Sequence, residues 1–147
     1  MVADGVPSED IPEESLFARW VTIAQAALAV EGEVCIQIVS SNESQALNRD
    51  YRSKDYPTNV LSFPADLPVE FGVMGDLAIC WDVVLREAAE QSKTVNDHLA
   101  HMVVHGVLHL AGLDHLEDEQ AEAMEQIERD VLAQFDIADP YLTPKGD

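Results

Sequence analysis

Apolar residues recur every three to four positions in two long stretches of the chain, a spacing that places them on one face of a helix. The first stretch predicts a helix over residues 13–30, and Gly32 is positioned to end it, since glycine readily takes the left-handed conformation of a helix C-terminus. The second stretch predicts a final helix over residues 117–135. Its apolar stripe consists of Met124, Ile127, Val131, Leu132 and Phe135.

The segment between these helices predicts strands and three shorter helices. Apolar runs indicate strands over residues 33–39, 59–63 and 76–81. Polar residues then offer helix caps: Ser41 or Asn42 for a helix through Tyr51, Asp82 for a helix to residue 91, and Asn96 for a helix to residue 111. We therefore expect a single α+β domain over residues 1–147, with a small mixed β-sheet and about five packed helices.

The helix expected over residues 96–111 carries four of the five histidines of the chain. His98, His101, His105 and His109 fall on a single face, and the other positions are apolar nearly all round, which is typical of a buried helix. Buried imidazoles need hydrogen-bond partners. We interpret His98 as a core histidine paired with a carbonyl or carboxylate, and leave the role of His101 open.

The end of this helix has the spacing of a metal site. His105 and His109 lie one helical turn apart, Gly112 can reverse the chain, and His115 can then return toward the first two rings. The pattern H-x-x-x-H-x-x-G-x-x-H is the ligand frame of the metzincin zinc proteases. It predicts one Zn²⁺ held by His105, His109 and His115, with water in the fourth position. Such an ion lowers the pKa of its water from 15.7 to about 7.

One residue within the frame argues against a protease. The proteases place a glutamate, their general base, directly after the first histidine. Here that position is Gly106, which has no side chain to accept a proton. A divergent metallopeptidase is therefore the less favoured interpretation, and hydrolysis of a substrate whose leaving group needs less help is favoured.

The charge balance restricts the class of partner. The chain has 8 Lys and Arg against 28 Asp and Glu, a net charge of −20, which argues against nucleic-acid binding by a broad basic face. Three of the cations nevertheless cluster, as Arg49, Arg52 and Lys54. An arginine beside a metal could clamp a phosphate, whereas the simpler interpretation is that each cation pairs with a surface carboxylate.

The remaining polar residues carry weaker signals. We interpret the acidic run from Asp114 to Glu128 mainly as the solvated face of the last helix, although Asp114 could orient the His115 ring. Cys35 and Cys80 are expected to be reduced, buried thiols. The N-terminus lacks the pattern of a secretory signal, and no apolar run suffices to cross a bilayer, so a cytoplasmic protein without membrane association is expected.

Four blocks of the sequence resemble the YbeY family of bacterial rRNA-maturation endoribonucleases. The segment from His105 to His115 is similar to the family signature H-G-x-L-H-L-x-G-Y-D-H, with Leu113 in place of the usual aromatic residue. The segment 51–63, the stretch 75–79 and the closing 139–141 are similar to further blocks of the family, in the same order.

The resemblance implies a zinc-dependent endoribonuclease, specific for single-stranded RNA, that acts in 16S rRNA 3′-end maturation and ribosome quality control. It transfers a functional arginine onto Arg52, which we expect to be catalytic, and Arg49 and Lys54 are expected to bind RNA. The extreme acidity suggests that the substrate is met on the ribosome or beside basic ribosomal proteins. A metal-stabilised ribosome-assembly factor with weak or incidental nuclease activity is the alternative.

Overall fold

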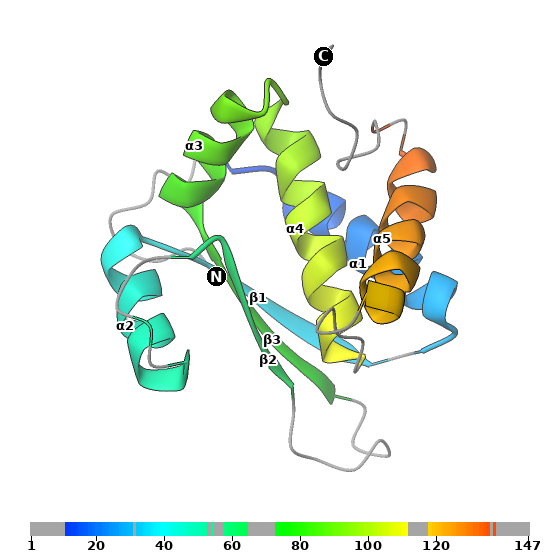
Figure 1. Cartoon of the computed structure of the whole chain (residues 1–147), viewed down its shortest axis with the longest axis horizontal. Helices are drawn as coiled ribbons and strands as arrows, with labels where there is room; N and C mark the ends of the chain where they lie inside the picture. The colour runs from blue at the N-terminus through cyan, green and yellow to red at the C-terminus, as the bar shows by residue number, and fades with distance from the viewer. Residues whose placement is uncertain are drawn as a thin grey trace.

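A computed structural model describes residues 11–30, 32–52, 54, 58–64, 73–111, 118–135 and 137. Within them the elements follow the order α1 (Glu14–Leu28), β1 (Glu33–Val39), α2 (Ser41–Arg52), β2 (Val60–Pro64), β3 (Val73–Cys80), α3 (Trp81–Glu90), α4 (Val95–Leu110) and α5 (Asp118–Ala133) (Figure 1). The expected α+β class is confirmed. No helix among these residues is both long enough and apolar enough to span a bilayer.

The sheet is mixed, as expected, and β3 is its central strand. β1 pairs with β3 in parallel, with Ile36 opposite Leu77, whereas β2 pairs antiparallel on the other side. Side chains of a strand alternate between its two faces. Leu77 therefore belongs to the larger core beneath α1 and α4, while Ala78 belongs to a smaller core shared with Leu47 of α2.

Helix α4 occupies the centre of the molecule, which confirms the predicted buried helix. It packs against α1, α3 and α5 and also against strands β2 and β3 (Figure 1). Eleven of its sixteen residues are buried. A helix enclosed in this way presents each of its faces to a different element, so its polar residues must find partners on those elements.

Gly106 lies on the face of α4 that packs closely against Leu77 of β3. A Cβ atom at this position would lie 2.6 Å from Leu77 Cδ2 and 2.9 Å from Leu77 Cδ1, well inside van der Waals contact. Leu77 is itself only 1% exposed. The glycine that replaces the protease glutamate is thus explained by packing, because there is no space for a side chain between the helix and the strand.

The predicted starts of α4 and α2 are corrected by one or two residues. Thr94, rather than Asn96, caps α4, and its Oγ1 accepts a hydrogen bond from the backbone N–H of Asp97 at 3.1 Å. At α2 the cap is Ser40, whose Oγ accepts from the backbone N–H of Glu43 at 3.3 Å. In both segments several adjacent polar residues could cap, and the tertiary fold selects among them.

The junction between β3 and α3 also differs from the prediction. β3 begins at Val73 and ends at Cys80, so the buried Trp81 opens the helix instead of closing the strand. Asp82 is not the cap. It lies in the first turn of α3 and accepts a hydrogen bond from Ser41 Oγ at 2.8 Å. The aspartate therefore ties α3 to α2.

Two further expectations are wrong in detail. Helix α1 ends at Leu28, with Ala29 in the left-handed conformation at φ 55°, so Gly32 does not end the helix. Gly32 instead lies against Met74, where a Cβ would be 2.6 Å from Met74 Cγ.

Cys35 and Cys80 are free thiols, as expected, but only Cys80 is buried. Cys35 is exposed, as is Asp76, its partner in the parallel register of β1 and β3.

Candidate metal and active site

The four histidines of α4 form a continuous row. The ring centroids of His98 and His101 are 6.1 Å apart, those of His101 and His105 are 6.1 Å apart, and those of His105 and His109 are 4.6 Å apart. Each neighbouring pair meets edge to face. The single face predicted from helical spacing is confirmed, and the row becomes more exposed toward the C-terminus of the helix.

His98 closes the buried end of the row as a structural residue. Its Nε2 lies 2.8 Å from Glu87 Oε1 on α3, and the ring is 2% exposed. The hydrogen bond from His98 lowers the pKa of Glu87 below its ordinary value, against the opposing effect of burial. The interpretation of His98 as a core histidine paired with a carboxylate is confirmed.

Glu128 of α5 lies behind the middle of the row, with none of its surface exposed. Oε1 is 2.6 Å from His101 Nε2, and Oε2 is 3.1 Å from His105 Nδ1. Burial raises the pKa of this carboxyl, but hydrogen bonds from His101 and His105 outweigh burial and lower the pKa to about 2. Glu128 is therefore an ionised, acceptor-only group, and both histidines donate to it.

His105 and His109 converge beyond this carboxylate. Their Nε2 atoms lie 3.1 Å apart at the more exposed end of the row. Two imidazoles bound to one tetrahedral Zn²⁺ at about 2.0–2.1 Å place their nitrogens about 3.3 Å apart. The pair fits a divalent metal in both the distance between its donors and their chemistry.

A second grouping of possible ligands, His101, His105 and Glu128, is better described as a hydrogen-bonded cluster. These residues offer donor atoms within 4.8 Å of one another. However, the 2.6 Å between His101 Nε2 and Glu128 Oε1 is shorter than the separation of two ligands on one tetrahedral ion, and it matches a strong charge-assisted hydrogen bond. A proton, rather than a metal, fits between these two atoms.

The other predicted site residues are placed less completely. His115, together with Gly112 and Asp114, lies outside the described residues. Arg52 is the last residue of α2, and its side chain is also outside them. Helix α2 packs on the face of the sheet opposite α4.

The two cations next to Arg52 are described. Arg49 is exposed and pairs with the adjacent Asp50 at 3.4 Å, in the way the simpler interpretation expects. Lys54 is exposed, and its backbone N–H donates to the carbonyl of Asn48 at 3.3 Å. Both side chains can therefore reach solvent beside the end of α2.

Glu128 is the functional candidate that the sequence interpretation missed, because it was grouped with the solvated acids of the last helix. Glu122 is exposed, as that grouping expects, whereas Glu128 is fully buried. The signal was its position: Glu128 follows Met124 by four residues and precedes Leu132 by four, so it lies within the apolar stripe. A carboxylate in the buried stripe of a helix requires partners on the facing element.

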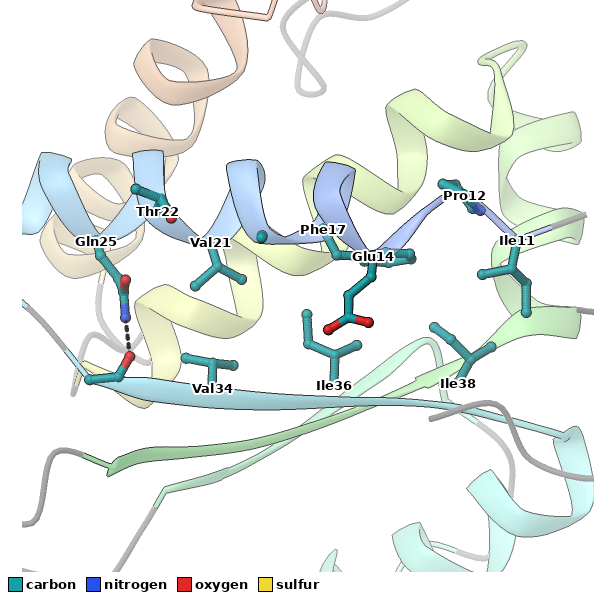
Figure 2. A pocket seen from close by; sticks show the side chains of 12 residues that line it. Ile11, Pro12, Glu14, Phe17, Val21, Thr22, Gln25, Val34, Ile36 and Ile38 are labelled. Carbon is teal, nitrogen blue, oxygen red and sulfur yellow. Dashed lines mark hydrogen bonds between the residues drawn. The ribbon is translucent and has the colours of Figure 1, made fainter.

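An apolar groove of about 450 Å³ lies away from the histidines, between α1 and β1 (Figure 2). Val21 and Phe17 line one wall and Ile36 the other, while Gln25 Nε2 donates to the carbonyl of Gly32 at 2.7 Å across one end. The residues described along this groove include neither histidine nor cysteine.

The fold and the site together define a class: an α+β protein whose central helix presents a histidine cluster suited to a divalent metal. Comparison with known proteins makes the class specific. The family model described as Endoribonuclease YbeY matches residues 7–136. The chain therefore belongs to the YbeY endoribonuclease family, and as a member it is a hydrolase of the endoribonuclease class.

Curated relatives and a solved structure agree with this assignment. Endoribonuclease YbeY of Stenotrophomonas maltophilia is 51% identical and is covered over 91% of its length by 95% of this chain. The Pseudomonas putida protein of the same name is 48% identical, with 92% of this chain and 88% of that protein covered. The solution structure of TM1509 from Thermotoga maritima superposes with a TM-score of 0.58 at 27% identity, covering 99% of this chain and 97% of that one.

Proposed function

We propose that the protein is a zinc-dependent, single-strand-specific endoribonuclease that acts in 16S rRNA 3′-end maturation and ribosome quality control in the cytoplasm. The observation that carries the metal part is the 3.1 Å approach of His105 Nε2 and His109 Nε2 on a buried helix. Family membership supports RNA as the substrate. In this proposal His115 supplies the third ligand of one ion, water completes the coordination, and residues 1–147 act as a single domain.

A metal bound there would supply a Lewis acid for a phosphate oxygen and for the attacking water. The protein contributes the geometry. His105 and His109 lie one turn apart on α4, and the packing of this helix against its neighbours fixes the backbone positions from which the two rings extend. Arg52 is proposed as the catalytic residue that neutralises the charge growing on the phosphodiester.

The end of α2 is the proposed contact for RNA. Arg49 and Lys54 are exposed cations that can meet phosphates, and Tyr51 between them is 69% exposed. Phe63 of β2 supports the tyrosine edge to face, with ring centroids 4.4 Å apart. An exposed, supported aromatic ring beside cations is the arrangement on which unpaired bases stack, and this supports a preference for single strands.

The net charge of −20 supports a basic partner for this protein. An acidic protein repels RNA over most of its surface, so the proposed encounter takes place on the ribosome, with ribosomal proteins beside the cleavage site. The same acidity favours a second candidate function, a ribosome-assembly factor whose nuclease activity is incidental. Cleavage of purified RNA at a rate that depends on the metal separates the two functions.

A peptidase is disfavoured by the contact between Gly106 and Leu77. Gly106 occupies the position at which the proteases carry their base. A Cβ atom there would lie 2.6 Å from Cδ2 of the buried Leu77. A side chain long enough to accept a proton from water does not fit there without displacement of the Leu77 side chain.

The test incubates purified protein with single-stranded RNA, duplex RNA and casein, with and without a chelator. Single-stranded RNA alone should be cleaved, and the chelator should abolish cleavage. A His105→Ala/His109→Ala variant should lose both bound metal and activity. Retention of full RNA cleavage by that variant would assign the activity to a contaminant and refute the proposal.

A further inference from the structure

We propose that Glu128 is a positioning residue for the metal site: it holds His105 in the tautomer that directs the unprotonated Nε2 toward His109, and His101 holds Glu128 in place. This inference rests on the proposed function, because it assumes that His105 and His109 bind a metal. It concerns residues that lie behind the ligands and not the ligands themselves.

The first step is the hydrogen bond to His105. Glu128 Oε2 lies 3.1 Å from His105 Nδ1 and Oε1 lies 2.6 Å from His101 Nε2, so each oxygen of the carboxylate faces a ring nitrogen and accepts from it. The proton of a neutral His105 must therefore be on Nδ1, which leaves the lone pair on Nε2. That is the atom that lies 3.1 Å from His109 Nε2. The negative charge behind the ring also makes Nε2 a stronger donor to a cation.

The second step is the anchoring of the carboxylate. Glu128 projects from α5. The orientation of its carboxylate depends on the contact made by Oε1, the oxygen that does not face His105. His101 Nε2 lies 2.6 Å from Oε1, the distance of a short hydrogen bond that the ring donates to the carboxylate. With one oxygen held by His101, the other is fixed on His105. The order of contacts is His101 to Glu128 to His105 to the metal position.

Helix α4 carries a second histidine–carboxylate pair that does not lead to the metal position. His98 makes a similar bond of 2.8 Å to Glu87, yet it lies two turns from the converging Nε2 atoms, at the buried end of the row. Both pairs stabilise α4 against a neighbouring helix. Only the Glu128 pair continues to a ring that faces the metal position, so Glu87 is a matched control for the purely structural contribution.

The experiment measures Zn²⁺ affinity by competition with a chromogenic chelator at neutral pH. Glu128→Gln preserves the size of the side chain but places an NH₂ donor against one of two N–H donors, so one histidine must change tautomer. We expect affinity to fall about 10- to 100-fold. Glu87→Gln should lose thermal stability but bind Zn²⁺ with an affinity within about twofold of the wild-type value. The lost hydrogen bond to His98 weakens the packing of α3 on α4 but leaves the orientation of His105 and His109 unchanged.

A second measurement does not depend on the folding of any variant. Long-range ¹H–¹⁵N correlation spectra of the metal-free wild-type protein report which ring nitrogen carries the proton. We expect the Nδ1–H form for His105, and the Nε2–H form would overturn the inference. Wild-type affinity in Glu128→Gln would overturn it too. Loss of Zn²⁺ binding in His105→Ala tests the underlying site: if that variant loses the metal but Glu128→Gln does not, the inference alone fails, and if neither loses it, the proposed site fails.

Discussion

A side chain at Gly106 would test the packing of α4 on the sheet. In Gly106→Ala the new Cβ would lie 2.6 Å and 2.9 Å from the two methyl groups of Leu77, and Leu77 is 1% exposed, so neither group can move into solvent. Overpacking of this kind costs about 1–3 kcal/mol. Alanine in place of glycine within a helix returns about 1 kcal/mol through backbone entropy. The net expectation is a decrease of up to about 2 kcal/mol in the free energy of unfolding.

In a Leu77→Ala background the same Gly106→Ala substitution should change stability in the opposite direction. Leu77→Ala removes the two methyl groups that the new Cβ would meet. In that background Gly106→Ala keeps its helical advantage and fills part of the cavity, so it should stabilise the protein by about 1 kcal/mol. The change from destabilising to stabilising is a coupling energy between two residues in contact.

A double-mutant cycle compares the wild-type protein, Gly106→Ala, Leu77→Ala and the double variant. Their free energies of unfolding are measured by urea unfolding followed by circular dichroism. Leu77→Ala alone should be less stable than the wild-type protein by about 2–5 kcal/mol, and the double variant should recover part of that loss. An equal effect of Gly106→Ala in both backgrounds would refute the packing explanation. The presence of glycine where proteases have glutamate would then need another cause.

Three further predictions concern charge and RNA. The pKa of Glu87 is lowered by its bond with His98, so the pair stabilises the fold above pH 4.5 and this stabilisation is lost as the pH falls through the folded-state pKa. Urea midpoints at pH 7 and pH 3 should therefore differ less in Glu87→Gln than in the wild-type protein, and an unchanged difference would count against this linkage. Tyr51→Ala should weaken binding of a single-stranded oligonucleotide by about 1–3 kcal/mol. Fluorescence anisotropy measures this binding. Leu85→Ala, which truncates another exposed apolar residue, should bind the oligonucleotide normally, and an equal loss of affinity in both variants would contradict the stacking role of Tyr51. Arg52→Glu should abolish RNA cleavage without loss of bound zinc by metal analysis, whereas zinc loss would make Arg52 structural.

Much of the fold could be predicted from the sequence, because its cause is local. Helical periodicity placed the first and last helices within a few residues, polar capping residues placed the other three, and apolar runs placed the three strands. The row of histidines on α4 follows from a 100° step per residue and needs no tertiary information. Helix starts were less predictable. Thr94 and Asn96 are both good caps, and the choice between them depends on the course of the chain between α3 and α4.

The candidate site was predictable only in part. The convergence of His105 and His109 is a property of one helix, so their spacing determined it. The role of Glu128 is a property of two helices. Its buried position could be inferred from the apolar stripe of α5, but its partners could not, since the stripe does not specify which helix faces it.

By itself, the sequence determined which residues share a face, as in the four imidazoles of α4 and the apolar stripe of α5. It also determined that a glycine stands where the metzincin frame has a glutamate. Local geometry suffices for this, because a helix fixes the direction of each side chain relative to its neighbours. Only the tertiary structure decided what each face meets. It placed Leu77 against Gly106, Glu87 on His98, and Glu128 between His101 and His105. These contacts join segments distant in the chain, and the burial of the whole core, which no local pattern specifies, holds them together.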